Sequence, residues 1–132
     1  MAKRILSVDD DHSVQDLVSM HLLLQGFEVK TAVDGEEAIS ILANEPFDLV
    51  LLDIEMPKVD GLEVLRYIKT HHIDVRIIML TGADNLPALN ECAKLGAFDY
   101  LPKPYNFHEL MDSIDRLLAD IDSPLPASEH LL

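Results

Sequence analysis

The chain has 132 residues, 48% of them apolar and 26% charged, which suits one globular domain with a single hydrophobic core. Its 24 acidic and 10 basic residues give a formal net charge of −14, which argues against direct nucleic-acid binding, because such binding depends on clustered lysine and arginine. A single cysteine, Cys92, excludes an internal disulfide framework, and the lack of a signal peptide or a membrane-spanning apolar run favours a cytoplasmic protein without membrane association.

The first predicted elements are a short strand and a helix. Residues 5–8 form an apolar run that suits a buried strand, and three successive aspartates follow it. The last of these, Asp11, is a suitable N-cap for the helix, and Gly26 is a suitable residue to end it. Five residues recur at helical spacing and predict the buried stripe of this helix: Val14, Leu17, Val18, His21 and Leu24.

The next elements lead to the most informative strand of the chain. Residues 27–33 predict a second strand and residues 36–44 a second helix, joined by a turn at residues 34–35. The run Leu49-Val50-Leu51-Leu52 has no polar interruption, which is typical of a strand buried on both faces in a parallel sheet. This strand delivers one carboxylate, Asp53, at its carboxyl end.

The second half of the chain continues the alternation. We predict two more strands, at residues 75–80 and 97–101. Three more helices are predicted, from about Leu62 to His71, from about Asn85 to Leu95 and from Phe107 to Ile121. The last helix has the clearest pattern, since its apolar residues recur at steps of three and four.

Five strands alternating with five helices predict an α/β fold. Short connections imply a parallel five-stranded sheet with right-handed crossovers and helices on both faces, which is a three-layer doubly wound sandwich. A flavodoxin-like strand order is the common choice at this size. We expect the domain to occupy residues 1–122, and residues 123–132, with two prolines, to form a flexible tail or the start of a linker.

Reactive side chains follow four of the five predicted strands. Asp9 and Asp10 follow the first strand, Asp53 ends the third, Thr81 follows the fourth, and Lys103 follows the fifth. Because the carboxyl ends of parallel strands share one edge of the sheet, we expect these groups to converge there. Three neighbouring carboxylates repel one another unless a cation neutralises them, and hard oxygen ligands suit Mg²⁺ or Mn²⁺. Lys103 and the Thr81 hydroxyl would complete a pocket for a small dianion.

The chemistry that these groups allow is phosphoryl transfer onto a carboxylate. Asp53 would be the nucleophile and form an acyl phosphate, while the metal and Lys103 neutralise charge on the oxygens of the transferring group. The sequence has no GxxxxGK loop and no GxGxxG turn, so we expect no nucleotide and no organic cofactor. The donor must therefore carry its own activated phosphoryl group.

Four motifs stand at the predicted strand ends. They are Val8-Asp9-Asp10-Asp11, Leu52-Asp53-Ile54-Glu55-Met56-Pro57 followed by Asp60-Gly61, Leu80-Thr81-Gly82, and Asp99-Tyr100-Leu101-Pro102-Lys103-Pro104. Each motif is weak by itself, but their order and places are together highly specific. Over about residues 3–121 the chain resembles the receiver domain of two-component response regulators, in particular the chemotaxis type that consists of a single receiver domain.

The resemblance implies a phosphoacceptor and a metal site. Asp53 matches the phosphoacceptor and also a metal ligand, and Asp10 matches a direct metal ligand. The backbone carbonyl of Glu55 matches the remaining protein ligand, and Asp9 matches an acid that acts on the metal through water. Glu55 and Asp84 occupy two positions that vary in the family and that often tune the lifetime of the acyl phosphate.

The resemblance also implies a switch. Thr81 matches the switch hydroxyl, Lys103 the lysine that contacts the phosphoryl group, and Tyr100 the aromatic side chain that changes rotamer. Gly82 matches the small residue that leaves the pocket accessible, and a cis peptide is expected between Lys103 and Pro104.

The implied function is signalling by a phosphoacceptor domain and not enzymatic turnover of a separate substrate. The donor would be a phosphohistidine of a sensor histidine kinase or a histidine phosphotransfer protein. Phosphorylation would change the surface made by the last two helices and the strand between them, and so control a downstream protein, an output domain or a homodimer. Neither nucleic acid nor membrane is expected as a direct partner.

Two other functions are compatible with parts of the pattern. The three aspartates after the first strand partly fit the DxD signature of haloacid dehalogenase-type phosphatases, although that reading leaves Asp53 without a role. A pseudo-receiver that binds partners without phosphorylation is the other alternative, and the complete set of acids, threonine and lysine argues against it.

Overall fold

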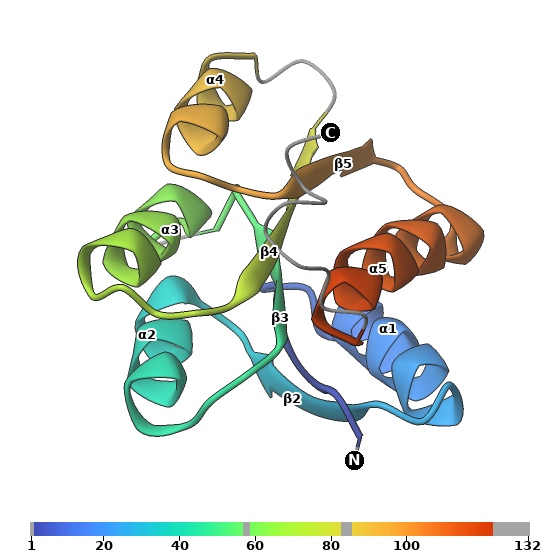
Figure 1. Cartoon of the computed structure of the whole chain (residues 1–132). Coiled ribbons are helices and arrows are strands. Elements are labelled where there is room, and N and C mark those ends of the chain that lie inside the picture. Colours follow the sequence, from blue (N-terminus) through green and yellow to red (C-terminus); the bar gives the residue numbers. More distant parts are fainter. Residues whose placement is uncertain (1, 57–58, 83–85, 123–132) are drawn as a thin grey trace, which may run out of the picture.

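The computed structural model describes residues 2–56, 59–82 and 86–122, and Figure 1 shows the path of the chain. Strands and helices alternate along the whole described chain, as predicted. In chain order they are β1 (Arg4–Val8), α1 (His12–Leu24), β2 (Glu28–Ala32), α2 (Gly35–Asn44), β3 (Leu49–Asp53), α3 (Gly61–Thr70), β4 (Arg76–Gly82), α4 (Leu86–Lys94), β5 (Asp99–Lys103) and α5 (Phe107–Asp122).

The five strands form one parallel sheet in the order β2-β1-β3-β4-β5, which confirms the predicted flavodoxin-like fold. β3 is the central strand, and all five of its residues are buried, which explains its unbroken apolar run. Leu52 of β3 pairs with Val8 of β1, and Asp53 pairs with Leu80 of β4. The strands that flank β3 therefore end close to the level of Asp53.

Helices cover both faces of the sheet (Figure 1). α2, α3 and α4 lie on one face, and α1 and α5 lie side by side on the other. Each face has its own buried cluster, because alternate residues of the strands point to opposite sides. Leu52 belongs to the cluster under α2, α3 and α4, whereas Leu51 belongs to the cluster under α1 and α5.

The buried face of α1 differs from the predicted stripe. Val18 is buried as expected, but Leu17 and Leu24 are 54% and 77% exposed, so their predicted burial is wrong. The residues of α1 that are buried are Gln15, Val18 and Leu22. α1 carries apolar residues around most of its circumference, so periodicity could not select the inner face, and a polar residue occupies part of it.

The carboxyl ends of β4 and β5 extend further than predicted. β4 continues through Thr81 to Gly82, and β5 spans Asp99–Lys103 instead of residues 97–101. The two strands pair to their last residues, where Thr81 lies opposite Pro102 and Gly82 opposite Lys103. Because β5 is an edge strand, Pro102 can stand within it without losing a ladder hydrogen bond on its outer side.

Aspartate side chains cap three helices at the carboxyl edge of the sheet. Asp11 accepts hydrogen bonds from the backbone N–H groups at the start of α1, which confirms its predicted role. Asp34 and Asp60 cap α2 and α3 in the same way, so the predicted turn at residues 34–35 is the start of α2. A Cβ atom on Gly61 would lie 2.3 Å from the Asp53 carbonyl oxygen, so a glycine is needed where α3 begins beside β3.

Some of the predictions made from the sequence concern residues with limited or no description. Asp84 and the predicted tail at residues 123–132 lie outside the described residues, and the domain boundary at residue 122 stays a prediction.

Cys92 is 3% exposed within the core, and burial raises the pKa of its thiol, which suits a packing role. None of the helices in the described part of the chain has the length and apolar character needed to cross a membrane.

Candidate functional site

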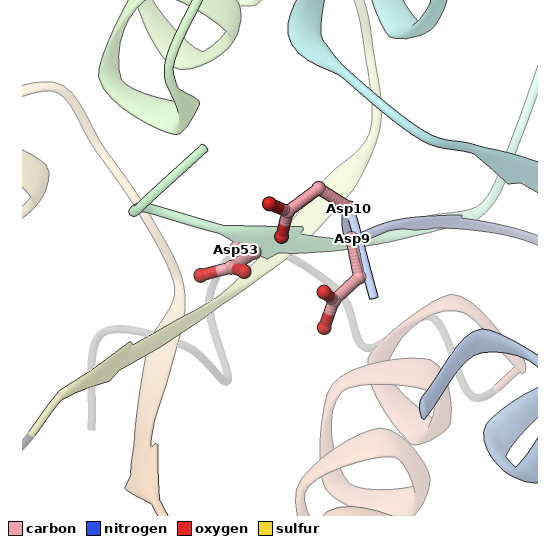
Figure 2. Close-up of side chains that lie close together, drawn as sticks. All are labelled: Asp9, Asp10 and Asp53. Carbon is pink, nitrogen blue, oxygen red and sulfur yellow. The ribbon is translucent and has the colours of Figure 1, made fainter. Parts of the chain in front are cut away.

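Three carboxylates meet where β1 and β3 end. Asp53 is the last residue of the central strand, and Asp9 and Asp10 directly follow β1, its neighbour in the sheet. One carboxylate oxygen from each of the three lies within 4.8 Å of the others (Figure 2). Asp9 and Asp53 are each 2% exposed, whereas Asp10 lies at the surface. The predicted convergence of these three acids is present in the structure.

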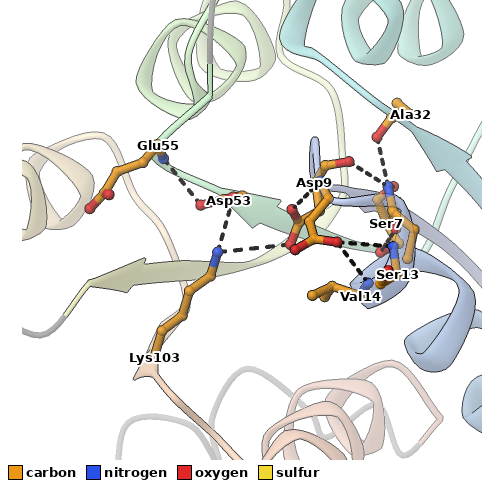
Figure 3. A network of polar contacts seen from close by, with 10 residues as sticks. Ser7, Asp9, Ser13, Val14, Ala32, Asp53, Glu55 and Lys103 are labelled. Atoms are coloured by element: carbon orange, nitrogen blue, oxygen red, sulfur yellow. Dashed lines mark hydrogen bonds and ion pairs between the residues drawn. The ribbon is translucent and has the colours of Figure 1, made fainter.

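Lys103 reaches this group from the end of β5. Its Nζ lies 3.0 Å from Oδ2 of Asp53, to which it donates a hydrogen bond, and 3.8 Å from Oδ2 of Asp9 (Figure 3). Burial by itself would lower the pKa of Lys103, but the hydrogen bond to Asp53 and the charges of Asp53 and Asp9 outweigh it and raise the pKa. Lys103 is therefore a permanent positive charge beside Asp53. The peptide bond that joins it to Pro104 is cis, as expected.

Burial makes Asp53 hard to ionise. Loss of contact with water raises its pKa from 3.8 to about 6, even though the hydrogen bond from Lys103 and its charge act in the opposite direction. The nearby charge of Asp9 adds to the increase, and a hydrogen bond from the Glu55 backbone N–H to Oδ1 opposes it. One lysine does not compensate for the buried acids, so the site favours a further positive charge.

The donor atoms of the site fit a hard divalent cation such as Mg²⁺. Oδ2 of Asp9 is buried and accepts no hydrogen bond from any described residue, while Oδ1 of the same group accepts one from the Asp11 backbone N–H. The Lys103 ammonium lies 3.8 Å from Oδ2, beyond hydrogen-bond distance, so a cation bound closer to it would lower the free-energy cost of its burial. Carboxylate oxygens from three residues, one of them open to water, suit an ion that keeps part of its water shell.

Thr81 and Tyr100, unlike Lys103, make no hydrogen bond or ion pair with the three acids among the described residues. Thr81 is fully buried next to Leu80, the β4 residue that pairs with Asp53, and its hydroxyl donates to the Gly82 carbonyl at 3.1 Å. Tyr100 stands on β5 and is 52% exposed. Glu55 presents an exposed side chain, and its backbone N–H faces Asp53.

One buried residue beside the acidic cluster was not predicted from the sequence. Gln15 of α1 is 4% exposed, and its side-chain amide bonds to the carbonyl groups of Ser7, Asp9 and Ala32. The signal that could have found it is the spacing of Gln15 with Val18 and Leu22, which places a polar residue on the inner face of a helix beside the acidic loop.

Comparisons with known proteins agree with this geometry. Residues 5–115 match the family described as response regulator receiver domain. The response regulator MprA of Mycobacterium sp. (strain KMS) is 41% identical over 118 residues, which are 89% of this chain and 51% of that protein. The chain thus spans about half the length of the curated relatives that it matches.

Two solved receiver-domain structures match over almost their whole length. A CheY-like response regulator receiver domain protein from Methanospirillum hungatei JF-1 has a TM-score of 0.88 and 33% identity, with 92% of this chain and 98% of that chain covered. The response regulator TrrA from Thermotoga maritima, in complex with Mg²⁺ and BeF, has a TM-score of 0.79 and 39% identity, with 88% and 99% covered.

Proposed function

The chain belongs to the response regulator receiver domain family, and we propose that Asp53 is the residue on which it accepts a phosphoryl group. A receiver domain is a phosphoacceptor signalling module and not an enzyme with a separate substrate. The observation that supports Asp53 is its place at the end of the central strand, with Lys103 at 3.0 Å and two further carboxylates beside it.

The acidic cluster would hold Mg²⁺, which Mn²⁺ can replace. Asp10 and Asp53 would supply carboxylate oxygens, Glu55 its backbone carbonyl, and Asp9 would act through a bound water. When bound, the ion supplies positive charge that stabilises the oxygens of a transferring phosphoryl group. It would also offset the cost of ionising Asp53, whose pKa burial raises to about 6.

The transfer step uses the ionised form of Asp53. One of its oxygens attacks the phosphorus atom of a phosphohistidine on a sensor histidine kinase or a histidine phosphotransfer protein. The P–N bond breaks, its electron pair remains on the imidazole nitrogen, and the new O–P bond makes an acyl phosphate. The Lys103 ammonium, which now donates a hydrogen bond to Asp53, would instead donate to an oxygen of the phosphoryl group and stabilise its negative charge.

The signal would leave the site through Thr81 and Tyr100. A phosphoryl group adds about −1.5 to −2 of charge and three strong acceptors. The Thr81 hydroxyl, which now donates to Gly82, would turn to one of these acceptors, and Tyr100 would turn inward from its half-exposed position. The surface of α4, β5 and α5 would change as a result and bind a downstream protein, an output domain or a second copy, with a coupling of about 1–3 kcal/mol.

We propose a single receiver domain, formed by residues 1–122, as in chemotaxis-type regulators. The match to nearly the full length of the CheY-like protein from M. hungatei supports this organisation. The half-length match to MprA supports the alternative, a receiver joined to a further domain. An immunoblot of the native protein separates the two, because a second domain of MprA size would roughly double the mass of 14.8 kDa.

The test of the phosphoacceptor is labelling with acetyl phosphate and Mg²⁺, followed by mass mapping of the modified residue. We expect one phosphoryl group on Asp53 and none in Asp53→Asn. Asp115→Asn is the matched control, since Asp115 is exposed on α5, is not one of the three clustered acids, and should label like the parent. Equal labelling of Asp53→Asn and the parent would refute the assignment.

Two further measurements, hydrolysis of an added phosphomonoester and titration with Mg²⁺, separate the two alternatives. Steady hydrolysis of a phosphomonoester, unaffected by Asp53→Asn, would support a phosphatase of the haloacid dehalogenase type. Absence of both labelling and millimolar Mg²⁺ affinity would support a pseudo-receiver.

A further inference from the structure

Gln15 is a polar residue on a buried helix face. It is 4% exposed, and the other buried residues of α1, Val18 and Leu22, are apolar. Removing an amide from water is costly unless its hydrogen bonds are replaced, so a glutamine on this face needs partners inside the protein.

The side-chain amide of Gln15 has all its partners at the carboxyl ends of β1 and β2. Nε2 lies within hydrogen-bond distance of the carbonyl oxygens of Ser7 at 2.9 Å, Asp9 at 3.1 Å and Ala32 at 2.7 Å, so its two N–H groups serve three acceptors and one of the bonds is bifurcated. Oε1 accepts a hydrogen bond from the Ser7 hydroxyl at 2.7 Å. Carbonyl oxygens only accept hydrogen bonds, so these three groups fix which way the amide points, and the Ser7 hydroxyl satisfies the remaining amide oxygen. In Figure 3, Ser7 and Ala32 lie on one side of Asp9, and Asp53 and Lys103 lie on the other.

One of these bonds restrains the peptide that carries Asp10. The Asp9 carbonyl belongs to the planar peptide group between Asp9 and Asp10, so holding that oxygen limits the direction in which the Asp10 backbone leaves. The Asp9 backbone N–H is held as well, by the Ala32 carbonyl at 3.1 Å. Hydrogen bonds to Gln15 and β2 therefore hold the backbone of Asp9 on the side opposite Asp53.

Asp10 depends on this restraint more than its neighbours do. The Asp53 carboxylate is held by Lys103 and the Glu55 N–H, and the Asp9 carboxylate by the Asp11 N–H. Within the described residues, no hydrogen bond or ion pair holds the carboxylate of Asp10, although it lies in the same acidic cluster. Repulsion from two nearby carboxylates favours its departure, and only its backbone keeps it in place.

We propose that Gln15 is a positioning residue of the acidic cluster, which holds the Asp9–Asp10 peptide so that Asp10 is preorganised for Mg²⁺. The proposal rests on the proposed function, because it assigns the affinity of that same metal site to a residue outside it. Mg²⁺ tolerates little deviation from octahedral geometry, and loss of residues that orient metal ligands typically lowers affinity about 10- to 100-fold.

The test compares three variants of the full chain by titration with Mg²⁺. Binding is measured from amide NMR shifts, because the chain has no tryptophan whose fluorescence could report it. Gln15→Met keeps the length of the side chain without its hydrogen bonds, and Ser7→Ala removes only the hydroxyl that donates to the amide oxygen of Gln15. Val18→Ala is the matched control, since it creates a small defect on the same buried face, about one turn further from the acidic loop than Gln15. Urea unfolding of each variant measures its loss of stability.

We expect Gln15→Met to raise the Kd for Mg²⁺ about tenfold, Ser7→Ala to raise it by less, and Val18→Ala to leave it within about twofold at a comparable loss of stability. Phosphorylation by acetyl phosphate should recover in Gln15→Met at saturating Mg²⁺. An unchanged Kd in Gln15→Met, or an equal increase in Val18→Ala, would show that Gln15 only stabilises the fold.

If Gln15→Met does not fold, Ser7→Ala decides, and a Kd indistinguishable from that of Val18→Ala overturns the role of Gln15. If the parent protein itself does not bind Mg²⁺, the proposed function fails and the role of Gln15 falls with it. A parent that binds Mg²⁺ with variants that bind equally well overturns the role of Gln15 alone.

Discussion

Replacing Asp53 with asparagine is expected to stabilise the protein at neutral pH when no Mg²⁺ is present. Burial raises the pKa of Asp53 to about 6, even with Lys103 as a hydrogen-bond donor 3.0 Å away. The folded protein therefore carries a carboxylate that ionises less readily than it does in the unfolded chain. Asparagine has nearly the same shape and no charge, so the variant avoids this cost.

The size and sign of the effect follow from the two pKa values. A rise from 3.8 to about 6 corresponds to about 3 kcal/mol, at 1.36 kcal/mol for each unit. The folded protein binds more protons than the unfolded chain between these values, so the free energy of unfolding falls as the pH rises from about 4 to about 6. Since Lys103 loses a charged acceptor in the variant, we expect a net gain of about 1–3 kcal/mol at pH 7.5 and little gain near pH 4.

The assay is urea unfolding at pH 4.5 and pH 7.5, in EDTA and in Mg²⁺. Mg²⁺ at a hundred times its Kd should stabilise the parent by about 2.7 kcal/mol and should have a much smaller effect on Asp53→Asn. Asp115→Asn, an exposed substitution on α5, controls for the loss of one acidic charge. The reasoning is refuted if Asp53→Asn is no more stable than the parent at pH 7.5 in EDTA, or if its gain over the parent is the same at the two pH values.

Three further substitutions test other parts of the site. Asp11→Ala removes the N-cap of α1 and should lower the free energy of unfolding by about 1 kcal/mol, measured by urea unfolding, while Mg²⁺ affinity changes little; a large loss of affinity would instead make Asp11 part of the metal site. Gly61→Ala places a Cβ atom 2.3 Å from the Asp53 carbonyl oxygen, so we expect a loss of about 1–3 kcal/mol and slower labelling by acetyl phosphate, and a variant with parental stability would show that the start of α3 can move freely. Lys103→Ala should keep Mg²⁺ binding but lose the NMR shift changes that beryllofluoride induces on α4, β5 and α5, and unchanged shifts on these elements would contradict the role of Lys103.

The sequence predicted the groups at the edge of the sheet better than the packing of α1. Asp9, Asp10, Asp53 and Lys103 meet as expected, because the carboxyl ends of parallel strands share an edge whatever their distance in the chain. The prediction of which face of α1 is buried was wrong, since Leu17 is exposed while Gln15 is buried. Hydrophobic spacing gives no weight to a glutamine, whose burial depends on carbonyl groups of β1 and β2 that the sequence does not place near it.

The sequence by itself determined the order of the elements, the class of fold and the residues that stand at the strand ends. These features depend on local periodicity and on the few ways in which alternating strands and helices can pack. The tertiary structure alone decided that β4 and β5 pair out to Gly82 and Lys103, that the pKa of Asp53 rises to about 6, and that Gln15 holds the Asp9–Asp10 peptide. Each of these depends on distances and burial between segments far apart in the chain, which no local pattern of residues records.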